Sequence, residues 1–128
     1  YEQNVMLEGT ILKISMVIPG KDSDEQVDAE EVADATVRVL KSCVPASLPG
    51  IVFLSGGQTD KQATSHLNAI NHIGPHPWPL SFSYGRAMQQ AALKLWAKDP
   101  KANVAEAQKT VHARARDNGL AALGRWNG

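Results

Sequence analysis

The sequence predicts an α/β fold built on a parallel sheet. Three short apolar runs, residues 5–13, 51–54 and 80–84, have the length and composition of strands. A segment with helical periodicity follows each run, and a further helical segment covers about residues 102–118. This alternation favours parallel strands joined by crossover helices. Polar residues stand where each strand ends, which is the active-site edge of a parallel sheet.

The composition indicates one soluble globular unit over residues 1–128. Hydrophobic residues make up 43% of the chain, and 13 Lys and Arg balance 13 Asp and Glu. Without a basic stripe, neither a nucleic acid nor a membrane is expected as a partner. No apolar run approaches the roughly 20 residues of a membrane span, and the first residues do not resemble a signal peptide. The single cysteine cannot form an intrachain disulfide, so we expect a cytoplasmic protein.

Lys13 is the first candidate functional residue. We interpret residues 5–13 as a buried strand, with Lys13 at its carboxyl end and its amine facing a cavity. Burial disfavours the charged form of an amine, and the neutral amine is a nucleophile that forms a Schiff base with a ketone or aldehyde. Taken alone, this run favours the alternative of a solvated surface lysine. The choice therefore depends on the other strand ends.

Two helices have clear start signals. Asp28 and Glu31 have the spacing of a capping box, at the start of a helix that ends before Pro45. Thr59 and Gln62 repeat that spacing ahead of the second helix. Each helix has apolar residues at helical spacing, which predicts one buried face. These residues are Val32, Ala33, Val37, Leu40 and Val44 in the first helix and Ala63, Leu67 and Ile70 in the second.

Histidines and tryptophans in the second half of the chain raise the question of other sites. The histidines are divided between a helix and a proline-broken loop, so we expect surface side chains and no metal. The tryptophans have no basic residues interleaved with them, so we expect packing anchors. The residues concerned are His66, His72, His76, Trp78, Trp96 and Trp126.

Two further strand ends suit a phosphate. Ser55, Gly56 and Gly57 place backbone amides ahead of a helix, and Gly85 with Arg86 supplies an amide and a guanidinium at another helix start. A phosphate held by the loops after the last two strands is a recurrent arrangement in barrels. The alternative is a plain tight turn and a solvated arginine. Both features together with the strand-end lysine favour a phosphate site.

Four segments of the chain resemble successive motifs of the class I fructose-1,6-bisphosphate aldolases, in the same order. They are LEGTILK at residues 7–13, FLSGGQ at 53–58, LNAIN at 67–71 and FSYGRA at 82–87. The resemblance covers nearly the whole chain. It implies about the last three βα units of a TIM (β/α)₈ barrel plus a C-terminal helix, with the N-terminal strands absent.

The resemblance also implies an activity. The family cleaves fructose 1,6-bisphosphate reversibly to dihydroxyacetone phosphate and glyceraldehyde 3-phosphate in glycolysis, with no metal or other cofactor. Lys13 would be the Schiff-base lysine, and the enzyme would be a homo-oligomer, a tetramer in particular. The residues that would contact the phosphorylated sugar, largely through a phosphate, are Ser55, Gly56, Gly57, Ser83, Gly85 and Arg86.

The sequence departs from the family pattern in several respects. Residues 14–17 read ISMV where the animal and plant enzymes usually read PNMV, a variant typical of bacterial members. The carboxylates and further lysines that the family uses as acids and bases are expected upstream of Tyr1. No residue of this chain can therefore be assigned those roles.

Three hypotheses remain open from the sequence. The intact protein is the glycolytic aldolase, or it is another lysine-imine barrel enzyme acting on a different phosphorylated sugar. Alternatively, the 128-residue chain by itself is a non-catalytic segment that at most binds phosphate or a partner. The length of the natural reading frame would separate catalysis by the intact protein from this last case.

Overall fold

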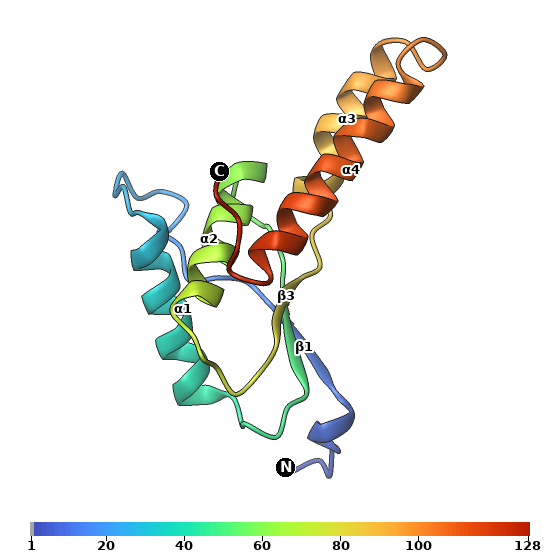
Figure 1. Ribbon diagram of the computed structural model, residues 1–128. Helices are drawn as coiled ribbons and strands as arrows, with labels where there is room; N and C mark the ends of the chain where they lie inside the picture. Colours follow the sequence, from blue (N-terminus) through green and yellow to red (C-terminus); the bar gives the residue numbers. More distant parts are fainter. Residues whose placement is uncertain (1) are drawn as a thin grey trace.

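The computed structural model describes residues 2–128. Their three strands form one parallel sheet in the order β1-β2-β3, and helices cover one of its faces (Figure 1). A short 3₁₀ helix, η1 (Leu7–Gly9), precedes the first strand. The strands are β1 (Ile11–Ile14), β2 (Gly50–Phe53) and β3 (Leu80–Phe82), and the helices are α1 (Ala29–Cys43), α2 (Asp60–His72), α3 (Arg86–Lys98) and α4 (Val104–Ala121).

Both strand pairs are parallel, which confirms the prediction made from the alternation of strands and helices. Lys13 is paired with Val52, and Val52 is paired with Ser81. Because side chains alternate across a strand, these three residues lie on one face of the sheet. The neighbouring Phe53 lies on the other face and is fully buried against the helices.

The first strand differs from the prediction. We expected a buried strand over residues 5–13, but β1 covers only Ile11–Ile14, and η1 occupies part of the remainder. Lys13 lies one residue before the end of β1 and is exposed, so the expectation of a buried lysine is wrong for this chain. β1 packs mainly against β2, which leaves Ile11 58% exposed. A strand becomes buried on its second face only when another element covers that face.

The covered face of the sheet forms the core. Both predicted capping boxes are present, with Asp28 accepting from the Glu31 amide and Thr59 accepting from the Gln62 amide. These caps satisfy backbone donors that would otherwise be unpaired at the helix starts. The predicted helix faces pack together with the strands in one cluster. Its members include Val32, Ala33, Val37, Leu40, Ala63, Leu67 and Ile70 from the helices and Ile51, Phe53 and Leu80 from the strands.

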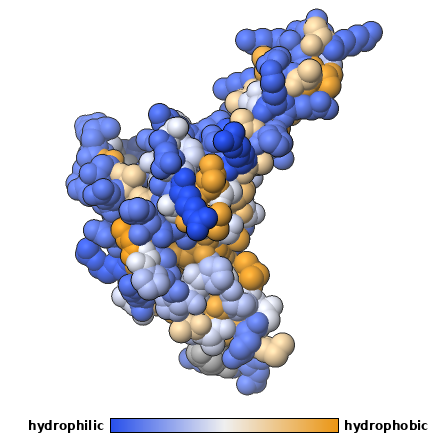
Figure 2. Space-filling view, viewed as in Figure 1, coloured by the Kyte–Doolittle hydropathy of each residue, from blue (hydrophilic) through white to orange (hydrophobic). Residues whose placement is uncertain are grey.

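Helices α3 and α4 form a hairpin that extends away from the sheet (Figure 1). An apolar groove of about 770 Å³ runs along it and is lined in part by Leu93 and Trp96. Apolar residues reach the surface both on this hairpin and near the sheet (Figure 2). Trp96 is 45% exposed, so the expectation of a packing anchor is wrong there. It is confirmed for Trp78, which is buried and donates its indole N–H to the Pro45 carbonyl at 2.8 Å.

No helix within residues 2–128 combines the length and the hydropathy that a membrane crossing requires.

Candidate active site

Lys13 and Ser83 meet on the open face of the sheet. The Lys13 Nζ donates a hydrogen bond to the Ser83 Oγ at 3.2 Å. The two residues are 70 positions apart in the sequence, and β2 lies between their strands. The lysine side chain therefore reaches across the middle strand to the residue that follows β3. Both residues are exposed, so the amine is open to a molecule approaching this face.

The chain leaves β2 through a tight turn. The Ser55 carbonyl accepts the Gln58 amide at 3.2 Å, and Gly57 has a φ of 75°. A residue with a side chain is strained at this φ, and a Cβ there would lie 3.0 Å from the Ile18 Cδ1. The turn therefore requires glycine at position 57. It leads directly into the cap of α2, and Ser55 is buried where the turn begins.

The chain enters α3 through Gly85. Its carbonyl accepts the amides of Met88 and Gln89, both at 3.1 Å, and no described side chain caps this helix start. A Cβ at Gly85 would meet no atom within 4 Å, so the space beside this residue is open. Arg86 is the first residue of α3 and is exposed. Uncapped amides at a helix start, together with a guanidinium, favour an anion.

Two of the predicted phosphate-binding residues line the same surface pocket. Gly57 and Arg86 line the same pocket of about 680 Å³, between the start of α2 and the side of α3. Lys61 and Lys94 line it too, and the sequence interpretation did not include them. Arg86 and Lys94 stand two helical turns apart, and this spacing is a signal that they share a face. The predicted residues that do not line this pocket are Lys13, Ser55, Gly56, Ser83 and Gly85.

Tyr84 attaches the segment between Ser83 and Gly85 to helix α2. The side chain is buried, and its hydroxyl donates to the Ala63 carbonyl at 2.8 Å. Burial raises the pKa of Tyr84, and the positive charge of Arg114 partly offsets this rise. The phenol therefore stays neutral and remains a donor. The sequence interpretation passed over Tyr84, although it lies between two predicted site residues.

His66 is buried, so the expectation of surface histidines is wrong at this position. Its Nδ1 lies 2.7 Å from the Gln58 Oε1, just after the glycine turn. Burial lowers the pKa of His66 from the usual 6.5, which favours the neutral ring. Within residues 2–128, no three His, Cys, Asp or Glu side chains are grouped so that they could share a metal ion.

The comparisons with known proteins agree on one family. The family model described as fructose-bisphosphate aldolase class-I matches residues 1–128. The chain belongs to the class I fructose-bisphosphate aldolase family. A probable class 1 fructose-bisphosphate aldolase from Xylella fastidiosa is 71% identical over the whole chain. The cytosolic fructose-bisphosphate aldolase 4 of Arabidopsis thaliana is 52% identical over 99% of the chain.

This aldolase chain corresponds to part of its relatives. It spans 38% of the length of the Xylella fastidiosa protein and 32% of the length of the Arabidopsis thaliana protein. A solved structure of the Plasmodium falciparum aldolase, in complex with TRAP and a small-molecule inhibitor, superposes with a TM-score of 0.94 at 46% identity. The match covers 99% of this chain and 36% of that one. The three strands and their helices are therefore a partial TIM barrel, which confirms the fold implied by the resemblance.

Proposed function

We propose that the intact protein is a class I fructose-bisphosphate aldolase, which cleaves fructose 1,6-bisphosphate reversibly in glycolysis. The observation that carries the proposal is the contact between Lys13 of β1 and Ser83, which directly follows β3: these two motif residues lie 3.2 Å apart across β2. The names of the relatives give further support. The proposal concerns the whole protein, because the chain spans only 38% of the Xylella fastidiosa relative.

Lys13 is the proposed nucleophile. Its amine attacks the C2 ketone carbon of the sugar, a nitrogen–carbon bond forms, and the ketone oxygen leaves as water. The iminium then accepts the electron pair of the C3–C4 bond as that bond breaks, while a general base takes the proton of the C4 hydroxyl. Glyceraldehyde 3-phosphate leaves. Protonation of the enamine at C3 and addition of water then release dihydroxyacetone phosphate and the free lysine.

The phosphate is proposed to lie between the turn after β2 and the start of α3. Gly57 and Arg86 share a pocket, and the exposed start of α3 offers amides without a side-chain cap. Charge-assisted hydrogen bonds from a guanidinium and from helix-start amides are the usual means of holding a phosphate. The full proposed set is Ser55, Gly56, Gly57, Ser83, Gly85 and Arg86.

The cellular location of the intact protein is proposed from the sequence, and its assembly is proposed from the family resemblance. We propose a cytoplasmic enzyme that forms a homo-oligomer. Relatives of this chain are named as cytosolic and as chloroplastic enzymes, so the family by itself does not decide the location.

The 128-residue chain by itself is proposed to be non-catalytic. The specific observation is the open face of the sheet, on which Lys13 is exposed and Ile11 is 58% exposed. Proton transfer from positioned groups typically contributes about 10² to 10⁴ in rate, and no residue of this chain is assigned that role.

Reductive trapping tests the proposed function. The intact protein is incubated with dihydroxyacetone phosphate and borohydride, and the adduct is mapped by peptide mass spectrometry. We expect the adduct on Lys13, no adduct in Lys13→Ala, and normal trapping in Lys21→Ala, a control in an exposed loop. An adduct on another lysine, or trapping by Lys13→Ala, would refute the assignment.

Chelation provides a second arm of this test. Because the iminium serves as the electron sink, EDTA should leave turnover unchanged. Loss of turnover that zinc restores would refute the Schiff-base mechanism.

A further inference from the structure

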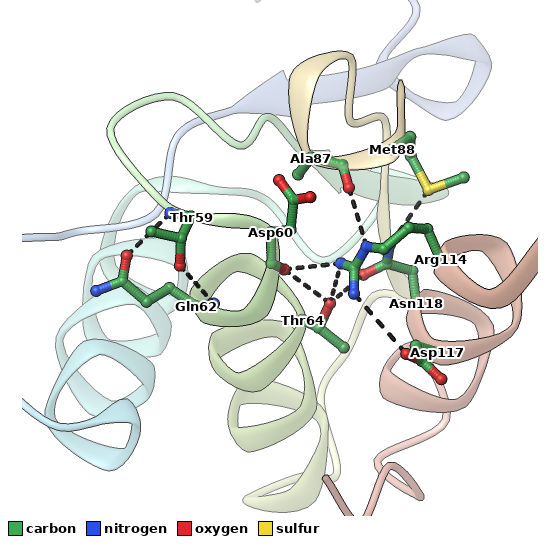
Figure 3. A network of polar contacts seen from close by, with 9 residues as sticks. All are labelled: Thr59, Asp60, Gln62, Thr64, Ala87, Met88, Arg114, Asp117 and Asn118. Atoms are coloured by element: carbon green, nitrogen blue, oxygen red, sulfur yellow. Dashed lines mark hydrogen bonds and ion pairs between the residues drawn. The ribbon is translucent and has the colours of Figure 1, made fainter. Parts of the chain in front are cut away.

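Arg114 connects the first turns of two helices (Figure 3). From α4, its Nη2 donates to the Asp60 carbonyl at 2.7 Å, and its Nε donates to the Ala87 carbonyl at 3.1 Å. Asp60 is the first residue of α2, and Ala87 is the second residue of α3. One planar guanidinium therefore bonds to the backbone of both helix starts.

The guanidinium has little freedom to move. The Arg114 side chain is 13% exposed, and its Nη1 lies 3.8 Å from the Asp117 carboxylate. It also donates to the Thr64 hydroxyl, which in turn contacts the buried Asn118 amide at 2.8 Å. The Asn118 Nδ2 contacts the Met88 sulfur at 3.2 Å, so the network returns to α3 (Figure 3). A planar guanidinium bonded to several fixed partners sets both the distance and the angle between the groups that it joins.

The two helix starts held by Arg114 carry the proposed phosphate residues. Asp60 lies three residues after Gly57, and Ala87 directly follows Arg86. Gly57, Asp60 and Arg86 line the same pocket. A shift of either helix start changes the separation between the glycine turn and the arginine. Misplacement by about 1 Å can cost on the order of 10²-fold in an enzyme, so this separation matters for a ligand held from both sides.

We propose that Arg114 is a positioning residue for the phosphate site, because it sets the spacing between the turn at residues 55–57 and Arg86. The inference rests on the proposed function. It assigns Arg114 no contact with the sugar and no part in carbon–nitrogen bond formation. Its loss should therefore weaken binding of the phosphorylated ketone and spare the reaction of Lys13 with a ketone that lacks phosphate.

The test uses the intact enzyme and two ketones, dihydroxyacetone phosphate and dihydroxyacetone. Borohydride trapping gives a half-saturating concentration for each. We expect Arg114→Met and Arg114→Lys to raise the value for the phosphorylated ketone about tenfold and to change the value for dihydroxyacetone less than about twofold. Lysine retains the charge, but it lacks the planar fork that spans both carbonyls. The matched control is Arg116→Met, an exposed arginine on the same helix, which should alter neither value.

The possible outcomes separate the inference from the proposed function. An equal loss for both ketones would mean that Arg114 only supports the fold, and it would overturn the inference. An unchanged value for the phosphorylated ketone would overturn it as well. Failure of the parent enzyme to trap either ketone would overturn the proposed function itself. If Arg114→Met does not fold, Arg114→Lys decides the question, since it keeps the length and charge of the side chain.

Discussion

The Lys13 Nζ lies 3.2 Å from the Ser83 Oγ, so the first and third strands of the sheet are connected by side chains across the strand between them. The hydroxyl oxygen accepts a hydrogen bond from the amine and limits the directions in which the lysine can point. Ser83 is one of the residues proposed to contact substrate. In the intact enzyme, Ser83 would therefore both contact the substrate and orient the Lys13 amine.

We expect Ser83→Ala to slow imine trapping in the intact enzyme by about three- to tenfold, because the hydrogen bond it removes is worth about 1 kcal/mol. Lys13→Ala should abolish trapping. Ser81→Ala is the matched control, since Ser81 lies two residues earlier in β3 and receives no hydrogen bond from Lys13. Single-turnover trapping with dihydroxyacetone phosphate measures the effect. Equal rates for Ser83→Ala and the parent would contradict this role.

Arg86→Ala should weaken the apparent affinity for a phosphorylated ligand by roughly one to two powers of ten. Hydrogen bonds to a charged group are typically worth about 1.5 to 3 kcal/mol, which corresponds to this range. Arg86→Lys should recover only part of the loss, because a point charge lacks the planar fork. Lys98→Ala, at the exposed end of the same helix and outside the pocket, is the control. Inhibition by inorganic phosphate measures the affinity, and undiminished binding by Arg86→Ala would refute the assignment.

Gly57→Ala should destabilise the intact protein by about 1 to 2 kcal/mol. The φ of 75° is unfavourable for alanine, and the added Cβ would lie 3.0 Å from the Ile18 Cδ1. Gly119→Ala is the control, and we expect it to change the free energy of unfolding in the opposite direction. Its Cβ meets nothing within 4 Å inside α4, so alanine should stabilise the helix by up to about 1 kcal/mol. Urea unfolding at unchanged m-value measures both changes, and an unaltered midpoint for Gly57→Ala would show that the turn relaxes freely.

Stability should fall as the pH drops below 6.5, the usual pKa of histidine, and His66 should contribute to this fall. Burial lowers the pKa of His66 in the folded state, so between the two pKa values the unfolded state binds more protons. Acid therefore favours unfolding. Above the pKa that His66 has in the unfolded state, this residue no longer contributes to the pH dependence of stability. Urea midpoints from about pH 7.5 to about pH 5.5 measure the slope.

His66→Gln should flatten this slope, because glutamine retains a polar contact for Gln58 and does not titrate. His112→Gln changes an exposed histidine on α4 and should leave the slope as in the parent. If His66→Gln and the parent lose stability equally on acidification, the slope originates elsewhere.

The 128-residue chain expressed alone should not cleave fructose 1,6-bisphosphate. Its outer strands, β1 and β3, each leave an edge unpaired within residues 2–128, and unpaired strand edges promote self-association. A complete barrel of this type has about 250 residues. Size-exclusion chromatography and a cleavage assay on the purified chain decide the matter. Turnover near that of a full-length aldolase from a monodisperse sample would contradict the expectation.

The local elements of this chain were predictable because their signals are local. Asp28 with Glu31 and Thr59 with Gln62 form capping boxes as their spacing indicated, since a cap depends only on neighbouring side chains and amides. The alternation of strands and helices likewise predicted the parallel sheet. The motifs around Lys13 and Arg86 led to the family that the comparisons identify, although the roles of the individual residues remain predictions.

The sequence by itself therefore determined the two capped helix starts, the order of the elements and the family. Only the tertiary structure decided which residues are buried and which distant side chains meet. Lys13 is exposed because no described element covers its face of the sheet, and His66 is buried because other residues pack over it. Arg114 reaches the starts of α2 and α3 only because the α3–α4 hairpin folds back onto α2. Burial and long-range contacts depend on which distant residues pack against a given residue. The sequence near that residue therefore does not predict them.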